Sequence, residues 1–200
     1  MTSDLSFTFP GHVILEQLGE THRSSVYRAR KAGEDRTVII KVFRLKEPSF
    51  AEITRFRREY ELLRNIDLDG IVKPVAFTDH EGIPAIILED FGGVSLKEII
   101  REGLNIEEFL RLAIRLSEIL GELHRRDISH RDIKPHNILL NRQTDTLKIT
   151  DFGISEKSEQ VYGDMSEEPD TIEGTLAYIS PEQTGRVNLG VDYRTDLYSL

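Results

Sequence analysis

Cysteine is absent from this chain of 200 residues. Its absence excludes a disulfide framework, a cysteine-based zinc site and a thiol nucleophile. Long apolar runs are missing too, because no segment approaches the roughly 18 consecutive apolar residues of a membrane-spanning helix. The stretch from Met1 to Pro10 also lacks the basic and apolar regions of a secretory signal. We therefore expect a cytoplasmic chain without a membrane segment.

An excess of basic residues is missing as well. The sequence contains 35 aspartate and glutamate residues against 26 lysine and arginine residues, and its formal net charge is −9. A protein that binds nucleic acid through the phosphate backbone needs a basic surface, so we expect no nucleic-acid partner. The hydrophobic share of 38% is sufficient for a folded core, which argues against a disordered or fibrous chain.

The N-terminal part of the chain has the pattern of a sheet with one helix. Between residues 13 and 43, short apolar or β-branched runs are separated by turn residues, which predicts an antiparallel meander. A helix is expected from Ser49, because Ser49 and Glu52 have the spacing of a capping box. Two further strands are predicted over residues 72–77 and 83–88.

After Gly92-Gly93 the pattern becomes mainly helical. Apolar residues then recur every three or four positions, as expected for one face of a long helix: Phe109, Leu112, Ala113, Leu116, Leu120 and Leu123. Two short strands are predicted over residues 138–141 and 147–150. The change of pattern predicts an α+β fold with a β-rich unit over residues 1–91, a mainly helical unit over residues 92–200 and a ligand site between them.

The most informative segment of the chain is His130-Arg131-Asp132-Ile133-Lys134-Pro135-His136-Asn137, which is followed by Asp151-Phe152-Gly153. Asn137 and Asp151 flank an apolar strand and supply hard oxygen atoms, which are the ligands that Mg²⁺ prefers. Each of these residues alone is more often a turn residue than a functional one. Their joint order is specific, because many positions must match at once.

The two segments resemble the catalytic loop and the metal-binding triplet of the protein kinase superfamily, in particular of bacterial eukaryotic-like (Hanks-type) serine/threonine kinases. The resemblance implies the two-lobed kinase fold and transfer of the γ-phosphoryl group of ATP to a serine or threonine hydroxyl of a protein. It also implies that Asp132 is the catalytic base and that Asn137 and Asp151 hold Mg²⁺. Lys134 is a further catalytic residue by this resemblance, because serine/threonine kinases typically carry a lysine at that place.

Lys41 lies within the apolar run from Val38 to Phe43. An unpaired ammonium group is costly to bury, so the run predicts an acidic partner. By resemblance, Lys41 contacts the α- and β-phosphates of ATP, and Glu59 on the following helix anchors Lys41. Two alternatives stay open: Lys41 could face solvent from an edge strand, and Glu61 could take the place of Glu59.

Glycine is scarce in residues 18–26, the segment that resembles the phosphate loop of kinases. Only Gly19 matches the family pattern, and Thr21 and Ser24 stand at the positions of the second and third glycines. Glycine lets backbone N–H groups approach phosphates without a Cβ atom in the way. We therefore expect a loop that covers ATP with weakened phosphate contacts.

The resemblance implies further nucleotide contacts. Residues 86–93 resemble the hinge between the two lobes, and we call residues 89–92 within them the hinge segment. There the carbonyl group of Glu89 and the N–H group of Phe91 would meet the adenine edge. Ile39 stands where the family usually has alanine, which predicts a narrower purine slot. The complete predicted nucleotide-binding set is Leu18, Gly19, Val26, Ile39, Lys41, Leu88, Glu89, Phe91, Asn137, Leu139 and Asp151.

Residues 174–182 resemble the end of the kinase activation segment, with Ser180 in place of the usual alanine. In many relatives the arginine that corresponds to Arg131 pairs with a phosphate on this segment. Thr171 and Ser166 are the expected phosphorylation sites. Residues 154–179 carry seven acids against one lysine, so two alternatives stay open: a carboxylate replaces the phosphate beside Arg131, or the segment is simply a solvated acidic loop.

Residues 192–200 resemble the start of the buried central helix of the second lobe, in which Asp196 supports the catalytic loop. We expect this helix to be truncated at Leu200 and the chain alone to be weak or inactive. A narrower resemblance, to the N-terminal kinase of large bacterial signalling proteins with a sensor histidine kinase, implies regulatory or sensor domains of the same chain as partners. The alternative function is a regulatory pseudokinase that binds nucleotide and acts through partners.

Overall fold

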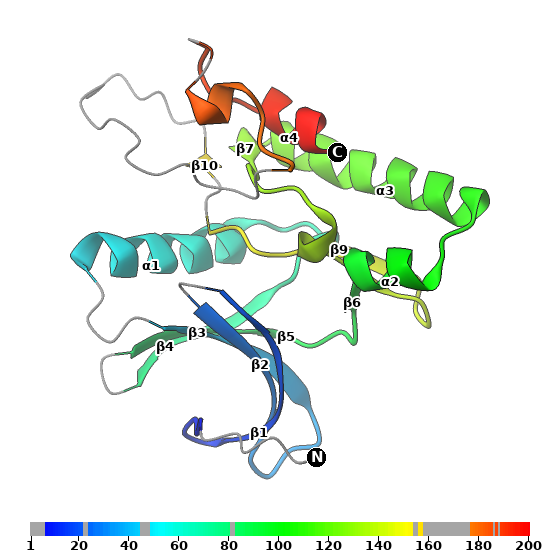
Figure 1. Ribbon diagram of the computed structural model, residues 1–200. Coiled ribbons are helices and arrows are strands. Elements are labelled where there is room, and N and C mark those ends of the chain that lie inside the picture. The colour runs from blue at the N-terminus through cyan, green and yellow to red at the C-terminus, as the bar shows by residue number, and fades with distance from the viewer. Residues whose placement is uncertain are drawn as a thin grey trace. The chain divides into compact units, whose positions relative to one another are not determined.

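The computed structural model of the chain describes residues 7–21, 24–44, 49–80, 83–153, 156–157, 177–185, 187 and 189–200. The chain divides into two compact units (Figure 1). The first comprises Met1–Asp67 and Val72–Gly92, and the second comprises Leu68–Ile71 and Gly93–Leu200. The last change of unit along the chain therefore falls between Gly92 and Gly93.

The first unit is built on a five-stranded antiparallel sheet with the strand order β1-β2-β3-β5-β4. Its strands are β1 (His12–Glu20), β2 (Ser24–Lys31), β3 (Thr37–Phe43), β4 (Pro74–His80) and β5 (Ile83–Glu89). The meander predicted between residues 13 and 43 is confirmed. β4 begins at Pro74, two residues later than predicted, because Val72 is buried without taking part in the strand ladder.

The two faces of β3 meet different surroundings, because successive side chains of a strand point to opposite faces. One face contributes to a core that consists of Phe9, Tyr27, Ala29, Val38, Ile40, Val42, Ala85 and Ile87. Lys41 and Phe43 lie on the other face. There Phe43 packs edge-on against Phe56 of α1 (Phe50–Asn65), with ring centroids 5.5 Å apart. Lys41 therefore lies on the face of the sheet against which α1 packs.

α1 begins at the predicted capping box. The Ser49 hydroxyl oxygen accepts a hydrogen bond from the N–H group of Glu52 at 3.3 Å, and the Glu52 carboxylate accepts one from the N–H group of Ser49 at 2.9 Å. The helix buries Phe56, Glu59 and Leu63. A carboxylate in an otherwise apolar stripe requires a partner, because an uncompensated buried charge is costly.

The second unit combines helices with short strands. Its helices are α2 (Leu96–Glu102), α3 (Ile106–His124) and α4 (Arg194–Ser199), and its single 3-10 turns are η1 (Pro135–Asn137) and η2 (Glu182–Thr184). Its strands are β6 (Val94–Ser95), β7 (Ile128–Ser129), β8 (Ile138–Asn141), β9 (Thr146–Ile149) and β10 (Glu156–Lys157), arranged as β6-β8-β9 and β10-β7. β8 agrees with its predicted bounds, and β9 is shifted by one residue. The α+β fold class is confirmed.

The long predicted helix is α3, which buries Leu112, Leu116, Leu120 and Leu123 along one face. Phe109, which also belongs to the predicted face, is 51% exposed. Phe109 lies on the same face one turn before Leu112, but burial of that face begins only at Leu112. Within the described ranges of the chain, no helix is both long enough and apolar enough to cross a membrane.

Candidate active site

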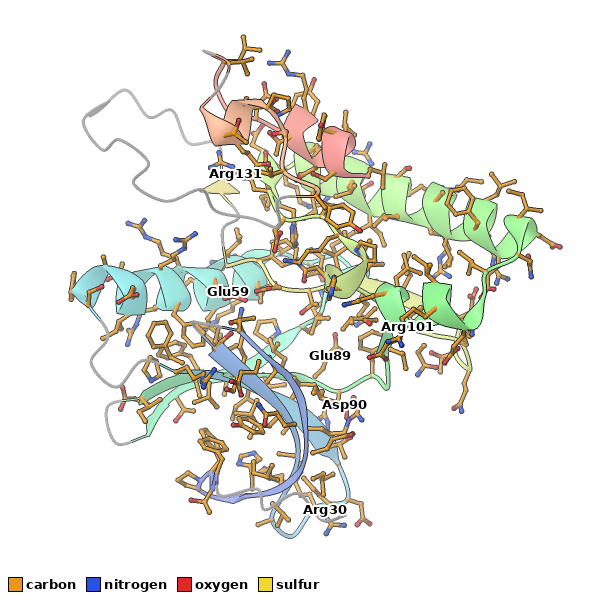
Figure 2. The ribbon with its side chains drawn as sticks, viewed as in Figure 1. Arg30, Glu59, Glu89, Asp90, Arg101 and Arg131 are labelled. Atoms are coloured by element: carbon orange, nitrogen blue, oxygen red, sulfur yellow. The ribbon has the colours of Figure 1, made fainter. Side chains whose placement is uncertain are left out.

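In the first unit, Lys41 and Glu59 form a buried ion pair. The Nζ atom of Lys41 lies 2.7 Å from Oε1 and 2.8 Å from Oε2 of Glu59, and the two residues are only 8% and 4% exposed. Figure 2 labels Glu59 on α1. Glu61, the rival partner, is exposed, and burial of Lys41 contradicts the alternative of a solvent-facing lysine. The acidic partner that the apolar run requires is therefore Glu59.

Several predicted nucleotide-binding residues share the face of the sheet that carries Lys41. Val26 lies opposite Lys41 in the β2–β3 ladder, and Ile39 lies opposite Leu88 in the β3–β5 ladder. Directly opposed residues project to the same side of a sheet. Val26, Ile39, Lys41 and Leu88 therefore form one continuous surface of the first unit.

The segment expected to cover phosphates is closed by its own hydrogen bonds. The N–H group of Thr21 donates to the carbonyl oxygen of Ser24 at 2.8 Å, and the N–H group of Ser24 donates to the Thr21 hydroxyl at 3.0 Å. Leu18 is exposed on β1. Gly19 lies opposite Val26, and a Cβ atom added to Gly19 would meet no atom of the described residues within 4 Å, its two chain neighbours left aside. The two residues that replace the family's glycines thus bond to each other.

The hinge segment begins at Glu89, the last residue of β5. The N–H group of Glu89 donates to the carbonyl oxygen of Lys73 at 3.0 Å, and the Glu89 carboxylate accepts from the N–H group of Lys73 at 2.7 Å. Phe91 is half-buried. Glu89 and Asp90 are labelled in Figure 2. Leu139, the remaining predicted adenine contact, belongs to the second unit, where it is half-buried on β8.

In the second unit, two predicted catalytic residues, Asp132 and Lys134, and one predicted Mg²⁺ ligand, Asn137, meet at one carboxylate. The Lys134 Nζ atom donates to Oδ2 of Asp132 at 2.6 Å, and the Asn137 side-chain amide donates to the same oxygen at 2.9 Å. The Asn137 amide also donates to the carbonyl oxygen of Asp132 at 2.8 Å. The carboxylate of Asp132 is therefore oriented by a neighbouring cation and by an amide.

Asn137 and Asp151 are brought close by the backbone. The N–H group of Thr150 donates to the carbonyl oxygen of Asn137 at 2.9 Å, and Asp151 is the next residue. Asp151 has φ +67° and Arg131 has φ +68°, a left-handed conformation that is strained for residues other than glycine. The structure thus holds Asp151 in an unfavourable backbone conformation beside the catalytic loop.

The side chains of Asn137 and Asp151 carry oxygen atoms, which are suitable ligands for Mg²⁺. The side-chain nitrogen of Asn137 donates two hydrogen bonds, so the side-chain oxygen is the atom of Asn137 that can bind a cation. The carboxylate of Asp151 can supply a further oxygen ligand. No group of three or more histidine, cysteine, aspartate or glutamate side chains is arranged to hold a metal ion in the part of the chain that the structure describes. Mg²⁺ in phosphoryl-transfer sites needs only one or two protein ligands, because phosphate oxygens and water complete its shell.

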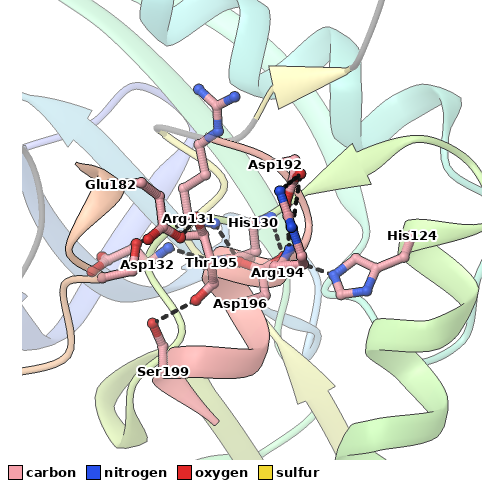
Figure 3. A network of polar contacts seen from close by, with 11 residues as sticks. His124, His130, Arg131, Asp132, Glu182, Asp192, Arg194, Thr195, Asp196 and Ser199 are labelled. Carbon is pink, nitrogen blue, oxygen red and sulfur yellow. Dashed lines mark hydrogen bonds and ion pairs between the residues drawn. The ribbon is translucent and has the colours of Figure 1, made fainter. Parts of the chain in front are cut away.

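The carboxylate of Asp196 binds backbone N–H groups of the predicted catalytic loop, residues 130–137 (Figure 3). Its Oδ2 atom accepts from the N–H group of His130 at 2.8 Å, and its Oδ1 atom accepts from the N–H group of Arg131 at 2.7 Å. His124 also contacts this carboxylate, with Nε2 2.9 Å from Oδ2. His124 and Asp196 are 72 positions apart, and no local pattern of the sequence predicts this contact.

His130 lies at the centre of the loop and is fully buried. Its Nδ1 atom accepts from the N–H group of Asp132 at 3.2 Å, and Nε2 lies 3.1 Å from the carbonyl oxygen of Thr150. The ring packs edge-on against Phe152, with centroids 4.6 Å apart. Burial lowers the pKa of His130 below its ordinary value, although Asp196 opposes the shift. The ring is therefore neutral and joins the loop to the Asp151-Phe152 segment.

A second network that the sequence did not predict joins η2 to the loop. The Gln183 side-chain amide donates to the carbonyl oxygen of Arg131 at 2.8 Å, and the Gln183 amide oxygen accepts from the Ser180 hydroxyl at 3.1 Å. The Thr195 hydroxyl donates to Glu182 at 2.8 Å. The one signal in the sequence is Ser180, a hydroxyl where the family pattern has alanine. The predicted phosphorylation sites Thr171 and Ser166 lie outside the described residues.

The Glu182 carboxylate is part of this network. Its burial acts to raise the pKa of Glu182, but hydrogen bonds, chiefly from its own N–H group and from the Thr195 hydroxyl, outweigh that effect and hold the pKa below its usual value. Glu182 is therefore ionised at neutral pH and supports the end of the predicted activation segment.

Comparisons with known proteins agree with this geometry. A family model described as protein kinase domain matches residues 12–200. The chain is 33% identical over 190 residues to the probable serine/threonine-protein kinase CPE1738 of Clostridium perfringens, covering 94% of this chain and 27% of that protein. It is 33% identical over 190 residues to the serine/threonine-protein kinase PrkC of Bacillus subtilis, covering 94% of this chain and 28% of PrkC. The chain thus spans little more than a quarter of the length of these relatives.

Proposed function

Because this chain belongs to the protein kinase domain family, we propose that it transfers the γ-phosphoryl group of ATP to a serine or threonine hydroxyl of a protein substrate. The observation that carries the proposal is the Asp132 carboxylate, which receives hydrogen bonds from both Lys134 and Asn137. A carboxylate fixed in this way can accept the proton of an attacking hydroxyl group. The curated relatives named above are serine/threonine kinases, which supports the substrate class.

The two units would supply different parts of the reaction. Residues 1–91 would bind the nucleotide, with Lys41 on the phosphates and the hinge segment on the adenine. Residues 92–200 would carry the chemistry. Asp132 accepts the hydroxyl proton, and the Lys134 ammonium group beside it stabilises negative charge on the transferred phosphoryl group. This division follows from which unit contains each residue.

Asn137 and Asp151 would hold Mg²⁺, whose charge neutralises the phosphate oxygens. The space around Gly19 supports a nucleotide near β1. Among the described residues, apart from Gly19 and its two chain neighbours, no atom lies within 4 Å of the position that a Cβ atom would take, so they give no steric reason for glycine there. Close approach of a phosphate to the backbone gives such a reason.

A regulatory module that binds nucleotide and acts only through partners is the second candidate. The hydrogen bonds between Thr21 and Ser24 favour it, because they occupy groups that would otherwise face phosphates. The presence of Lys41, Asp132, Asn137 and Asp151 favours the enzyme. We further propose a cytoplasmic signalling role, in which regulatory or sensor domains of the same protein control the kinase.

The test is transfer of labelled phosphate from ATP by the complete protein that contains this chain. Asp132→Asn should lower the transfer rate by about 10²–10⁴-fold, because it removes the base. Asp127→Asn is the matched control, since Asp127 is exposed and undergoes the same chemical change. Equal rates in the wild type and in Asp132→Asn would contradict the proposal and favour the regulatory module.

A further inference from the structure

The side chain of Arg28 on β2 joins two carboxylates of the first unit. Its Nε atom donates to Oδ2 of Asp90 at 2.8 Å, and its Nη1 atom contacts Oε1 of Glu16. Asp90 is the residue after β5, in the hinge segment (Figure 2). The side chain of Asp90 is only 6% exposed. The contact therefore differs from an ordinary surface ion pair, in which solvent competes for both charges.

Arg28 lies on the face of the sheet that carries the predicted nucleotide contacts. It is directly opposite Ile39 in the β2–β3 ladder, and Ile39 is directly opposite Leu88 in the β3–β5 ladder. Asp90 follows Leu88 by two positions, which places it on the same side of the extended chain. Arg28, Ile39 and Leu88 thus form a row across three strands that ends at Asp90.

The second oxygen of Asp90 fixes the backbone of the hinge segment. Its Oδ1 atom accepts a hydrogen bond from the N–H group of Gly92 at 3.0 Å. Gly92 has φ +70°, a conformation that glycine adopts without strain. One carboxylate therefore sets the turn that contains Phe91, whose N–H group is the expected donor to adenine. The Asp90 carboxylate is itself bound by Arg28 of β2.

We propose that Arg28 is a positioning residue for the nucleotide: through Asp90 it fixes the distance between the β2 strand and the hinge segment, and so the width of the adenine slot. The inference rests on the proposed ATP-dependent function. Arginine suits the task, because its planar guanidinium group can donate to two carboxylates at once from a fixed geometry. Glu16 from β1 completes the arrangement and ties a third strand to the same cation.

The test uses the complete protein with three single variants: Arg28→Gln, Asp90→Asn and the matched control Arg30→Gln. Arg30 lies two positions along the same strand, on the same face, and is exposed. Binding of Mg-ATP is measured with a fluorescent ATP analogue in competition with ATP. We expect Arg28→Gln and Asp90→Asn to raise the Kd by roughly five- to tenfold, and their double variant to raise it no further than the larger single effect. Arg30→Gln should stay within about twofold.

Two further readouts separate positioning from a general loss of structure. The kcat at saturating ATP should remain within about twofold of the wild type in Arg28→Gln, because the contact lies outside the transfer chemistry. Hydrogen exchange of the Gly92 amide, measured without nucleotide, should become faster in Arg28→Gln and stay unchanged in Arg30→Gln.

The outcomes distinguish the inference from the proposed function. If the wild type binds ATP and Arg28→Gln binds it equally well, the inference is wrong and the proposed function stands. If Arg28→Gln lowers kcat as much as it weakens binding and also melts earlier, the residue is merely structural and the inference is again overturned. If the wild type fails to bind ATP, both fall.

Discussion

Two buried carboxylates, Glu59 in the first unit and Asp196 in the second, are held by different kinds of partner. Glu59 pairs with the Lys41 ammonium group, which is the end of a flexible side chain. Asp196 accepts hydrogen bonds from the backbone N–H groups of His130 and Arg131. Side chains can separate and meet again while the backbone stays folded. Backbone donors that lose a buried acceptor remain unsatisfied, and the loop itself becomes unstable.

The comparison suggests a division of roles. Disturbing the ion pair of the first unit should reduce activity more than stability, whereas disturbing the carboxylate of the second unit should reduce stability first. The following variants are ordered by the size of the effect that we expect, and each can contradict this division.

The largest effect is expected for Lys41→Met. Removal of the ammonium group takes away the predicted phosphate contact, so the transfer rate should fall by about 10²–10³-fold. In the double variant Lys41→Met/Glu59→Gln, which leaves no buried carboxylate unpaired, the melting temperature should fall less than in Asp196→Asn. The double variant Lys41→Met/Glu59→Gln serves as the control, because it removes the carboxylate that the single change leaves unpaired. Full activity in Lys41→Met would disprove the assignment of Lys41.

Asp196→Asn should destabilise the protein by about 2–4 kcal/mol, because an amide nitrogen replaces one of the oxygens that accept from buried N–H groups. Thermal unfolding should show the midpoint lowered by roughly 4–16 °C. Asp192→Asn is the matched control, since the Asp192 side chain is 41% exposed and pairs with Arg194 at the surface. Equal melting of the two variants would remove the proposed difference between the units.

Glu59→Gln should lower the transfer rate by about tenfold, since a neutral amide orients Lys41 less well than a carboxylate. The same change at Glu61, two positions along α1 and exposed, should leave the rate within about twofold. Measuring both variants at saturating ATP tests which glutamate serves Lys41. A larger loss in Glu61→Gln would reverse the assignment that the ion pair suggests.

The smallest effect is expected from pH. Burial lowers the pKa of His130 in the folded protein, while in the unfolded chain it stays near about 6.5. The unfolded state therefore binds the additional proton, so the stabilising contribution is complete above about pH 6.5 and is lost as the pH falls toward the folded pKa. Urea unfolding should show a loss of about 1 kcal/mol between roughly pH 6.5 and 5.5 that is absent in His130→Phe. An unchanged slope in His130→Phe would show that His130 does not cause the loss.

Local patterns predicted the sheet, the cap of α1 and most of the buried face of α3. Each depends on residues close in sequence: the capping box joins Ser49 to Glu52, and the α3 stripe repeats every three or four residues. Phe109 fits this repeat and is exposed nevertheless. Periodicity predicts which residues share a face of the helix, but it does not predict how much of that face other elements cover. The partner of Lys41 could be narrowed to two glutamates on α1, and geometry selected Glu59.

The polar contacts that the sequence missed join residues far apart in the chain. His124 reaches Asp196 across 72 positions, Arg28 reaches Asp90 across 62, and Gln183 reaches Arg131 across 52. A polar residue on a surface and a polar residue with a buried partner have the same local pattern. Their difference arises only when the fold brings the two segments together.

The strained backbone at Asp151 has a consequence for how this domain could be engineered. Glycine adopts φ +67° with less backbone strain than aspartate. A search for stabilising substitutions would therefore select Asp151→Gly. That change would remove a proposed metal ligand. Asp127 has φ +57° and lies outside the proposed chemistry. Asp127→Gly would relieve the same kind of backbone strain and leave the proposed metal ligand in place. Two positions that look identical to a stability calculation are thus opposites as design targets.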